Sequence, residues 1–187
     1  LHKDPHAPRP TTTTTDKIQH LKVLFSERCH IDCVMCWQDH NNKEELEASH
    51  VIDSIPLDTI HSVELQGGEP LMLKSARDYF DHCSHHDVDI SLLTNGLLLT
   101  QAWQKRLVQH ASKIIVSLNA ATKHIHEKIN RGSQWEKVID NIHELRKRRD
   151  EEQSGLQIIG HMTIVEENIH EINAFIEQFE SWGFDAI

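Results

Sequence analysis

Three of the four cysteines lie close together, and their spacing is the strongest chemical signal in the sequence. Cys29, Cys33 and Cys36 form a Cys-x3-Cys-x2-Cys loop, whereas Cys83 lies far along the chain. Three thiolates in one short loop can bind one face of an iron–sulfur cube, and a [4Fe–4S] cluster normally takes four thiolates. Because this loop supplies only three, one iron would stay open to another ligand.

Two other chemistries fit the same cysteines. A structural zinc site is usually closed by four Cys or His ligands, and His30 or His40 could supply the fourth. Cys33 and Cys36 alone form a Cys-x-x-Cys pair, which is also typical of redox-active dithiols. The cluster does not resemble the disulfide framework of a small secreted domain, whose cysteines are spread along the chain. We therefore expect a cytoplasmic protein with metal-bound thiols, and the spacing leaves the metal open.

The elements that must position these cysteines alternate between strands and helices. Helical periodicity predicts helices at about 75–83, 101–110, 134–149 and 169–182. Ser133 and Glu136 have capping-box spacing at the start of the third helix, and Gly183 stands where a C-terminal cap would follow the fourth. Apolar runs predict six strands, at 20–25, 62–65, 89–93, 113–118, 156–165 and 184–187.

This alternation predicts an α/β fold, a partial (β/α)6 TIM-like barrel with parallel strands and outer helices. In such a fold the loops at the carboxyl ends of the strands share one rim, where active sites lie. Cys29 follows the first strand, residues 67–70 the second, residues 94–96 the third and Asn119 the fourth. The paired glycines of 67–70 let the backbone approach a ligand closely, and we interpret 94–96 as a turn.

Composition narrows the class of protein. The 187 residues suffice for one domain, and the formal net charge of −10 argues against broad nucleic-acid binding. No apolar run approaches the roughly 18 residues of a membrane span. Residues 1–18 hold three of the five prolines and a run of threonines, which predicts a flexible lead-in. Residues 19–187 are expected to form the barrel, which could be truncated at its C-terminal end.

The cysteine loop and three later segments together resemble the radical S-adenosylmethionine (radical SAM) superfamily. The loop from Cys29 to Trp37 matches the family's CxxxCxxC motif, and Gly67-Gly68-Glu69-Pro70 looks like its GGEP motif. Residues 117–119 (Ser-Leu-Asn) resemble its ribose motif, and residues 158–161 (Ile-Ile-Gly-His) lie where the family has an apolar element beside the adenine. The resemblance covers about residues 20–187. The Met-Cys-Trp ending is similar to the subgroup that modifies peptides or carbohydrates.

The resemblance implies a role for each matching residue. Cys29, Cys33 and Cys36 would hold a [4Fe–4S] cluster, and the methionyl amine and carboxylate of S-adenosylmethionine (SAM) would chelate its fourth iron. The 67–69 turn would accept hydrogen bonds from the amine, while residues on and after the fourth strand would reach the ribose or the carboxylate. The implied SAM-binding residues are Gly67, Gly68, Glu69, Ser117, Asn119 and Arg131.

The resemblance also implies an activity. A one-electron reductant such as flavodoxin or ferredoxin would reduce the cluster, which would cleave SAM to methionine and a 5′-deoxyadenosyl radical. That radical would abstract a hydrogen atom from a peptide, a sugar or a small metabolite. The alternative is a non-catalytic scaffold that holds zinc or a closed iron–sulfur cluster, and a third hypothesis is a thiol–disulfide oxidoreductase that uses Cys33 and Cys36.

Overall fold

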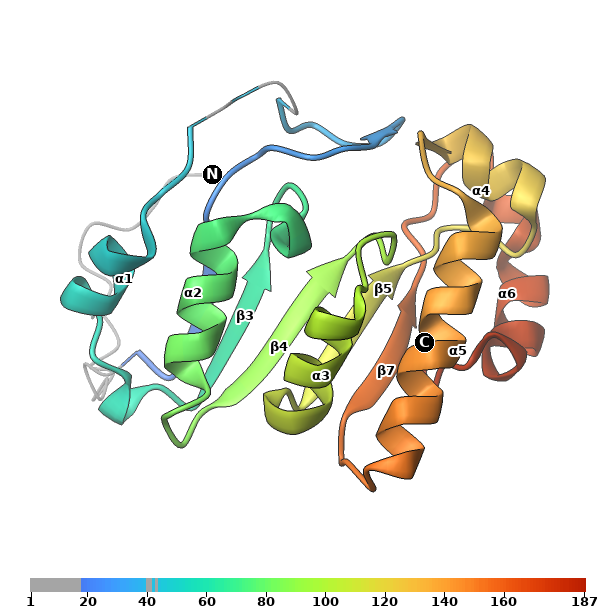
Figure 1. The fold of residues 1–187 in the computed structure, drawn as a ribbon. Helices are drawn as coiled ribbons and strands as arrows, with labels where there is room; N and C mark the ends of the chain where they lie inside the picture. Colours follow the sequence, from blue (N-terminus) through green and yellow to red (C-terminus); the bar gives the residue numbers. More distant parts are fainter. Residues whose placement is uncertain (1–17, 40–41, 43) are drawn as a thin grey trace, which may run out of the picture.

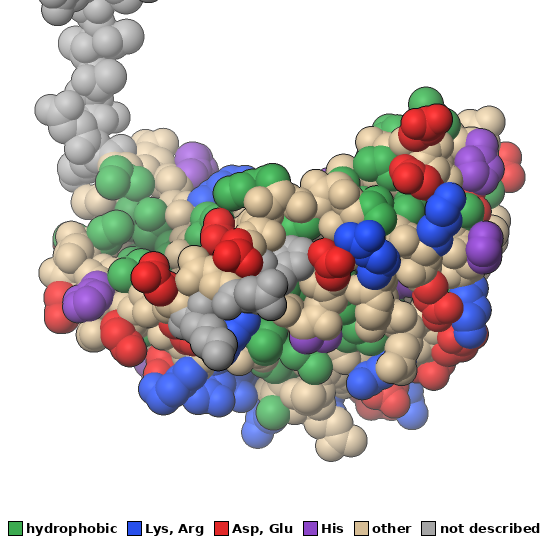
Figure 2. Space-filling view, turned by 90° about the horizontal axis from the view of Figure 1, so that it is seen from above, with side chains coloured by type: hydrophobic (Ala, Val, Ile, Leu, Met, Phe, Trp, Pro, Cys, Tyr) green, Lys and Arg blue, Asp and Glu red, His purple; other side chains and the backbone are tan. Residues whose placement is uncertain are grey.

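The computed structural model describes residues 18–39, 42 and 44–187, and its centre is a sheet of five parallel strands (Figure 1). The strands follow the order β1-β3-β4-β5-β7, and each neighbouring pair is parallel. Seen from the carboxyl ends of the strands, the molecule has a curved outline that is open on one side (Figure 2). The strands are β1 (His20–Leu24), β3 (Ser62–Gln66), β4 (Asp89–Thr94), β5 (Lys113–Ser117) and β7 (Gln157–His161).

Helices cover one face of this sheet. Helices α2, α3 and α5 lie across it, with α1 beside α2 and α4 beside α5 (Figure 1). This arrangement confirms the predicted α/β class, with a parallel sheet and outer helices. The helices are α1 (Ala48–Ser54), α2 (Lys74–Cys83), α3 (Gln101–His110), α4 (Lys123–Ile129), α5 (Trp135–Glu151) and α6 (Ile172–Gln178). Short 3-10 turns are η1 (Leu57–Thr59), η2 (Pro70–Met72), η3 (Ile169–Glu171) and η4 (Phe179–Trp182).

The two faces of the sheet differ in polarity because strand side chains alternate. In β3, Val63 and Leu65 are fully buried, whereas Glu64 between them is only half-buried. In β5, Ile114 and Val116 are likewise fully buried. The helix-covered face therefore forms the hydrophobic core, and the other face stays accessible.

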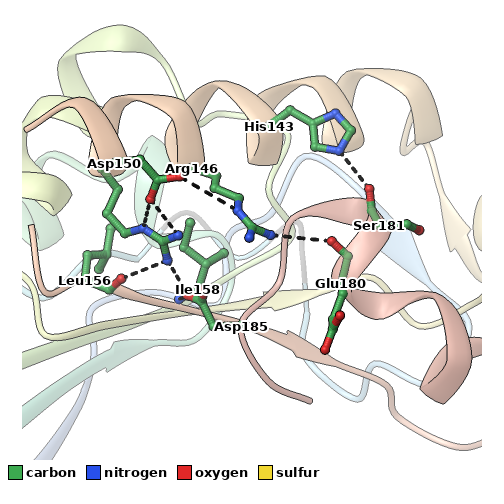
Figure 3. A network of polar contacts seen from close by, with 9 residues as sticks. His143, Arg146, Asp150, Leu156, Ile158, Glu180, Ser181 and Asp185 are labelled. Atoms are coloured by element: carbon green, nitrogen blue, oxygen red, sulfur yellow. Dashed lines mark hydrogen bonds and ion pairs between the residues drawn. The ribbon is translucent and has the colours of Figure 1, made fainter. Parts of the chain in front are cut away.

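The carboxyl-terminal segment occupies the place beside β7 that was expected for a sixth strand. It makes a single parallel bridge, from Ile159 to Ala186, so it is not a full strand. Polar contacts attach it firmly: the carboxylate of Asp185 accepts a hydrogen bond from the backbone of Ile158 (2.8 Å). Helix α5 holds the preceding turn, where His143 contacts the carbonyl of Ser181 (Figure 3).

Some local predictions were wrong. The helix expected over 169–182 is divided into η3, α6 and η4, although Gly183 does end η4 with a φ of 96°. The capping box is not formed, because Gln134 is the N-cap of α5 and Ser133 instead contacts the buried ring of His126 (2.8 Å). Helices α1 and α4 were not predicted at all.

The amino-terminal lead-in predicted over residues 1–18 lies outside the described residues, apart from Ile18. The domain boundary near residue 19 therefore stays a prediction. Among the helices of the described ranges, none is both long enough and apolar enough to cross a membrane.

Candidate functional site

A cavity of about 440 Å³ opens at the carboxyl ends of β1, β3, β4 and β5. It brings together loops that are far apart in the sequence, as expected for the rim of a parallel sheet. Two of the predicted site residues, Glu69 and Arg131, do not line it. The predicted residues that do are Cys29, Cys33, Cys36, Gly67, Gly68, Ser117 and Asn119.

The cysteine loop is anchored at its middle by a short antiparallel pairing. Strand β2 (Asp32–Cys33) pairs with β6 (Asn130–Arg131), which places Cys33 opposite Asn130. The backbone N–H of Cys36 donates to the carbonyl of Cys33 (3.0 Å) and closes the turn between the second and third cysteines. In Figure 1 this segment passes above the sheet to reach β2. Tertiary pairing thus holds the loop over the strand ends.

The thiols of Cys29 and Cys33 are poorly suited to ionise without a cation nearby. Burial raises the pKa of Cys33 to about 12, and the neighbouring Cys29 and Cys36 thiols add repulsion. Burial also raises the pKa of Cys29. Because metals bind the thiolate form, iron ions would supply the positive charge that makes ionisation favourable. Three neighbouring thiols in one cavity therefore fit an iron–sulfur cluster.

The arrangement fits a single metal ion less well. Within the described ranges, no three His, Cys, Asp or Glu side chains form a group that could hold one ion. A zinc site needs such convergence on one point, whereas in a [4Fe–4S] cluster each thiolate binds a different iron. Of the two histidines considered as a fourth zinc ligand, His30 is exposed and His40 lies outside the described residues.

The glycine turn after β3 packs directly on the start of the cysteine loop. Gly68 has a φ of +52°, and a Cβ atom there would lie 2.2 Å from the carbonyl oxygen of Arg28. The backbone N–H of Glu69 donates to this carbonyl oxygen of Arg28 (2.9 Å). The N–H of Gly68 donates to the side-chain oxygen of Gln38 (3.0 Å), which is also 3.8 Å from the sulfur of Cys36. Only glycine allows this close approach.

Gly68→Ala is expected to lower the free energy of unfolding by about 2 kcal/mol or more and to weaken SAM binding. The reason is the left-handed φ together with a clash against backbone that cannot move aside. Denaturant unfolding and SAM titration measure the two effects. Gly155→Ala is the matched control, since a Cβ there meets nothing within 4 Å, and it should leave both quantities nearly unchanged. Equal behaviour of the two variants would contradict the packing argument.

Glu69 lies behind the cavity, with its side chain fully buried. Its carboxylate accepts hydrogen bonds from the backbone N–H of Leu71 (3.1 Å), the hydroxyl of Thr94 (2.7 Å) and the backbone N–H of Asn95 (2.9 Å). Burial raises the pKa of Glu69 to about 7, and these hydrogen bonds act in the opposite direction. The side chain of Glu69 therefore joins the turn after β3 to the turn after β4, and hydrogen bonds from the SAM amine to the 67–69 turn stay a prediction.

Arg131 lies beside the cysteine strand, outside the cavity wall. Its guanidinium pairs with the carboxylate of Asp32 (2.7 Å) and donates to the carbonyl of the same residue (2.9 Å). The β2–β6 pairing sets these two residues opposite each other, so the arginine is drawn to the cysteine strand. Its side chain is 56% exposed and is not part of the cavity wall, and its pairing with the SAM carboxylate stays a prediction.

Asn119 lines the cavity, but both polar atoms of its side chain form hydrogen bonds within the protein. Its oxygen accepts from the backbone N–H of Thr163 (2.8 Å), and its nitrogen donates to Asn130 (3.0 Å). Its φ of 62° is left-handed, a conformation that asparagine tolerates better than most residues. Ser117 lines the same wall. Contacts from these residues to a ribose stay a prediction.

Two residues that sequence reasoning passed over lie close to the thiols. The side-chain nitrogen of Asn95, interpreted earlier as part of a turn, is 3.8 Å from the sulfur of Cys29. Trp37 lines the cavity and is 81% exposed, which is unusual for so large an apolar side chain. The available signals were weak: Asn95 follows a strand at the correct edge, and Trp37 follows the third cysteine.

Comparison with known sequences gives a consistent picture. A family model described as the radical SAM superfamily matches residues 23–179. The GTP 3′,8-cyclase of Aliarcobacter butzleri is 30% identical over 142 residues, which cover 70% of this chain and 44% of the relative. A probable GTP 3′,8-cyclase of Methanocaldococcus jannaschii is 26% identical over 133 residues, covering 67% and 45%. The chain spans less than half the length of these relatives.

Solved structures show the same fold. SuiB of Streptococcus suis superposes with a TM-score of 0.71 at 16% identity, covering 90% of this chain and 38% of SuiB. The protein anSMEcpe with bound AdoMet superposes with a TM-score of 0.70 at 20% identity, covering 90% and 50%. The family model spans most of the chain and includes both the cysteine loop and the glycine turn. This chain belongs to the radical SAM superfamily.

Proposed function

We propose that this chain is the core of an enzyme that binds a [4Fe–4S] cluster through Cys29, Cys33 and Cys36 and cleaves SAM reductively. The observation that carries the proposal is that these three thiols and the glycine turn line one cavity. When bound, the cluster and SAM supply one-electron cleavage of a carbon–sulfur bond and hydrogen-atom abstraction from a substrate. An external reductant such as flavodoxin or ferredoxin would supply the electron.

The chain's own residues would bind, orient and shield these groups. Gly67 and Gly68 line the cavity, so their backbone is proposed to accept hydrogen bonds from the SAM amine. Leu24, Ile31 and Leu93 line the same cavity and would keep water away from reactive species. Ser117 and Asn119 are proposed to contact the ribose or the carboxylate from the opposite wall, since both line that cavity.

The proposed substrate is a peptide, a sugar or a small metabolite. The curated relatives are named GTP 3′,8-cyclases, so a nucleotide is one candidate among the small metabolites. A structure of SuiB is described as bound to its precursor peptide, which keeps the peptide class in view. The sheet face opposite the helices is accessible, so a substrate could approach the cavity from that side.

Anaerobic reconstitution with iron and sulfide tests the proposal. We expect about four irons and four acid-labile sulfides per chain, the absorption of a [4Fe–4S] cluster, and an EPR signal after reduction with dithionite. Addition of SAM should then yield 5′-deoxyadenosine and methionine, measured by mass spectrometry. A protein that takes up zinc without acid-labile sulfide and forms no 5′-deoxyadenosine would overturn the proposal in favour of a metal-binding scaffold.

A further inference from the structure

The side-chain amide of Asn95 has a fixed orientation beside a proposed cluster ligand. Its oxygen accepts a hydrogen bond from the backbone N–H of Leu97 (3.1 Å), and its nitrogen lies 3.8 Å from the sulfur of Cys29. Since only the amide oxygen can accept from an N–H, the nitrogen must face the sulfur. The side chain is nearly buried, with 8% exposure, so water competes little for this contact.

Hydrogen bonds with Glu69 and with helix α5 hold the turn that carries Asn95 in place. Its backbone N–H donates to the buried carboxylate of Glu69 (2.9 Å). From the helix side, Asn141 of α5 donates to the carbonyls of Gly96 (2.8 Å) and Leu97 (3.2 Å). The N–H donor is therefore held in place before any cluster binds, and it would not need to be ordered on binding.

The side-chain amide beside Cys36 has the opposite orientation to that of Asn95 beside Cys29. There the neighbouring side-chain amide, that of Gln38, presents its oxygen 3.8 Å from the sulfur. That oxygen already accepts from the backbone N–H of Gly68 (3.0 Å), so the amide is held with its acceptor toward the thiol. An oxygen acceptor does not stabilise negative charge on sulfur, whereas the N–H of Asn95 does.

We propose that Asn95 raises the reduction potential of the cluster by donating a hydrogen bond to the Cys29 thiolate. The inference rests on the proposed function, because Cys29 must be a cluster ligand. Reduction adds one electron and places more negative charge on the thiolate sulfurs, without making or breaking a covalent bond. A fixed N–H donor therefore stabilises the reduced cluster more than the oxidised one. Asn95 is thus a positioning residue that makes reduction by an external donor easier.

Redox titration of the reconstituted protein, followed by EPR, tests this in Asn95→Ser. Serine can still accept from the N–H of Leu97 through its hydroxyl, but it is too short to reach the sulfur. We expect the equilibrium constant for reduction to fall about tenfold, which is 59 mV for a one-electron couple. Asn141→Ala is the comparison, because it loosens the same turn but keeps the Asn95 amide, so it should lower the potential by less than Asn95→Ser does.

A measurement on the wild-type protein guards against a variant that fails to fold. Pulsed EPR of the reduced cluster, with ¹⁵N-labelled asparagine and without SAM, should detect a coupled side-chain nitrogen. Absence of that coupling, or equal potentials in wild type and Asn95→Ser, overturns the inference while the proposed function stands. A wild-type protein that forms no [4Fe–4S] cluster overturns both.

Discussion

Cys33→Ala is expected to abolish both cluster binding and SAM cleavage. Cys33 lies between the other two cysteines and is held in place by the β2–β6 pairing, so no nearby thiol can replace it. With two thiolates left, the loop cannot hold three corners of an iron–sulfur cube. Iron and sulfide content, EPR after reduction, and the yield of 5′-deoxyadenosine should all fall to the level of a buffer control.

Cys83→Ala is the matched control for this result. Cys83 is fully buried at the end of α2 and belongs to the core, not to the cavity wall. Its loss should reduce the free energy of unfolding by about 1 kcal/mol and leave the cluster intact.

Cys29→Ala distinguishes the cluster from the dithiol hypothesis, because a dithiol oxidoreductase using Cys33 and Cys36 would keep its activity in that variant. Retention of the cluster in Cys33→Ala would refute the assigned ligand set.

Glu69→Ala is expected to lower the free energy of unfolding by about 3 kcal/mol or more. The carboxylate is fully buried and accepts hydrogen bonds from Leu71, Thr94 and Asn95, so its removal leaves these donors without an acceptor. Each buried donor left unsatisfied costs about 1–3 kcal/mol. Denaturant unfolding followed by circular dichroism measures the loss. Cluster binding should weaken too, since the turn that holds Asn95 near Cys29 is released.

Glu64→Ala provides the comparison on the same strand. Glu64 forms a 2.9 Å ion pair with Lys22, whose side chain is 63% exposed, so solvent screens the interaction. Its removal should change the free energy of unfolding by less than about 1 kcal/mol. If Glu69→Ala proved as mild as Glu64→Ala, the carboxylate of Glu69 would not be what joins the two turns.

The contrast between these two glutamates shows that a motif does not determine where its side chains point. Both lie on or just after β3, and the sequence pattern does not show that one of them is fully buried. Glu69 is turned inward because three donors from two neighbouring loops meet there, and only the packed structure brings those loops together. The contact of Arg131 with Asp32 likewise depends on the β2–β6 pairing, which no local pattern shows.

The capping box predicted from local spacing was also wrong, because residues outside the helix offered competing contacts. Ser133 has the spacing of a helix cap, yet it contacts the buried ring of His126, a residue from the preceding helix. Glu136, its supposed partner, forms an ion pair with Lys123 (2.6 Å). The short helix α1 lacks an acidic first turn and a side-chain cap, so its sequence carries little helical signal.

The sequence by itself determined the parallel α/β architecture, the identity of the three thiols and the glycine turn. These features depend on short-range patterns: strand and helix periodicity, and cysteines within one loop. Only the tertiary structure decided which side chains reach those thiols. Asn95 lies 66 residues from Cys29 along the chain, and their contact exists because β4 packs beside β3 and sets its turn under the cysteine loop. Contacts between distant loops depend on how whole elements pack, and no local pattern of residues records that packing.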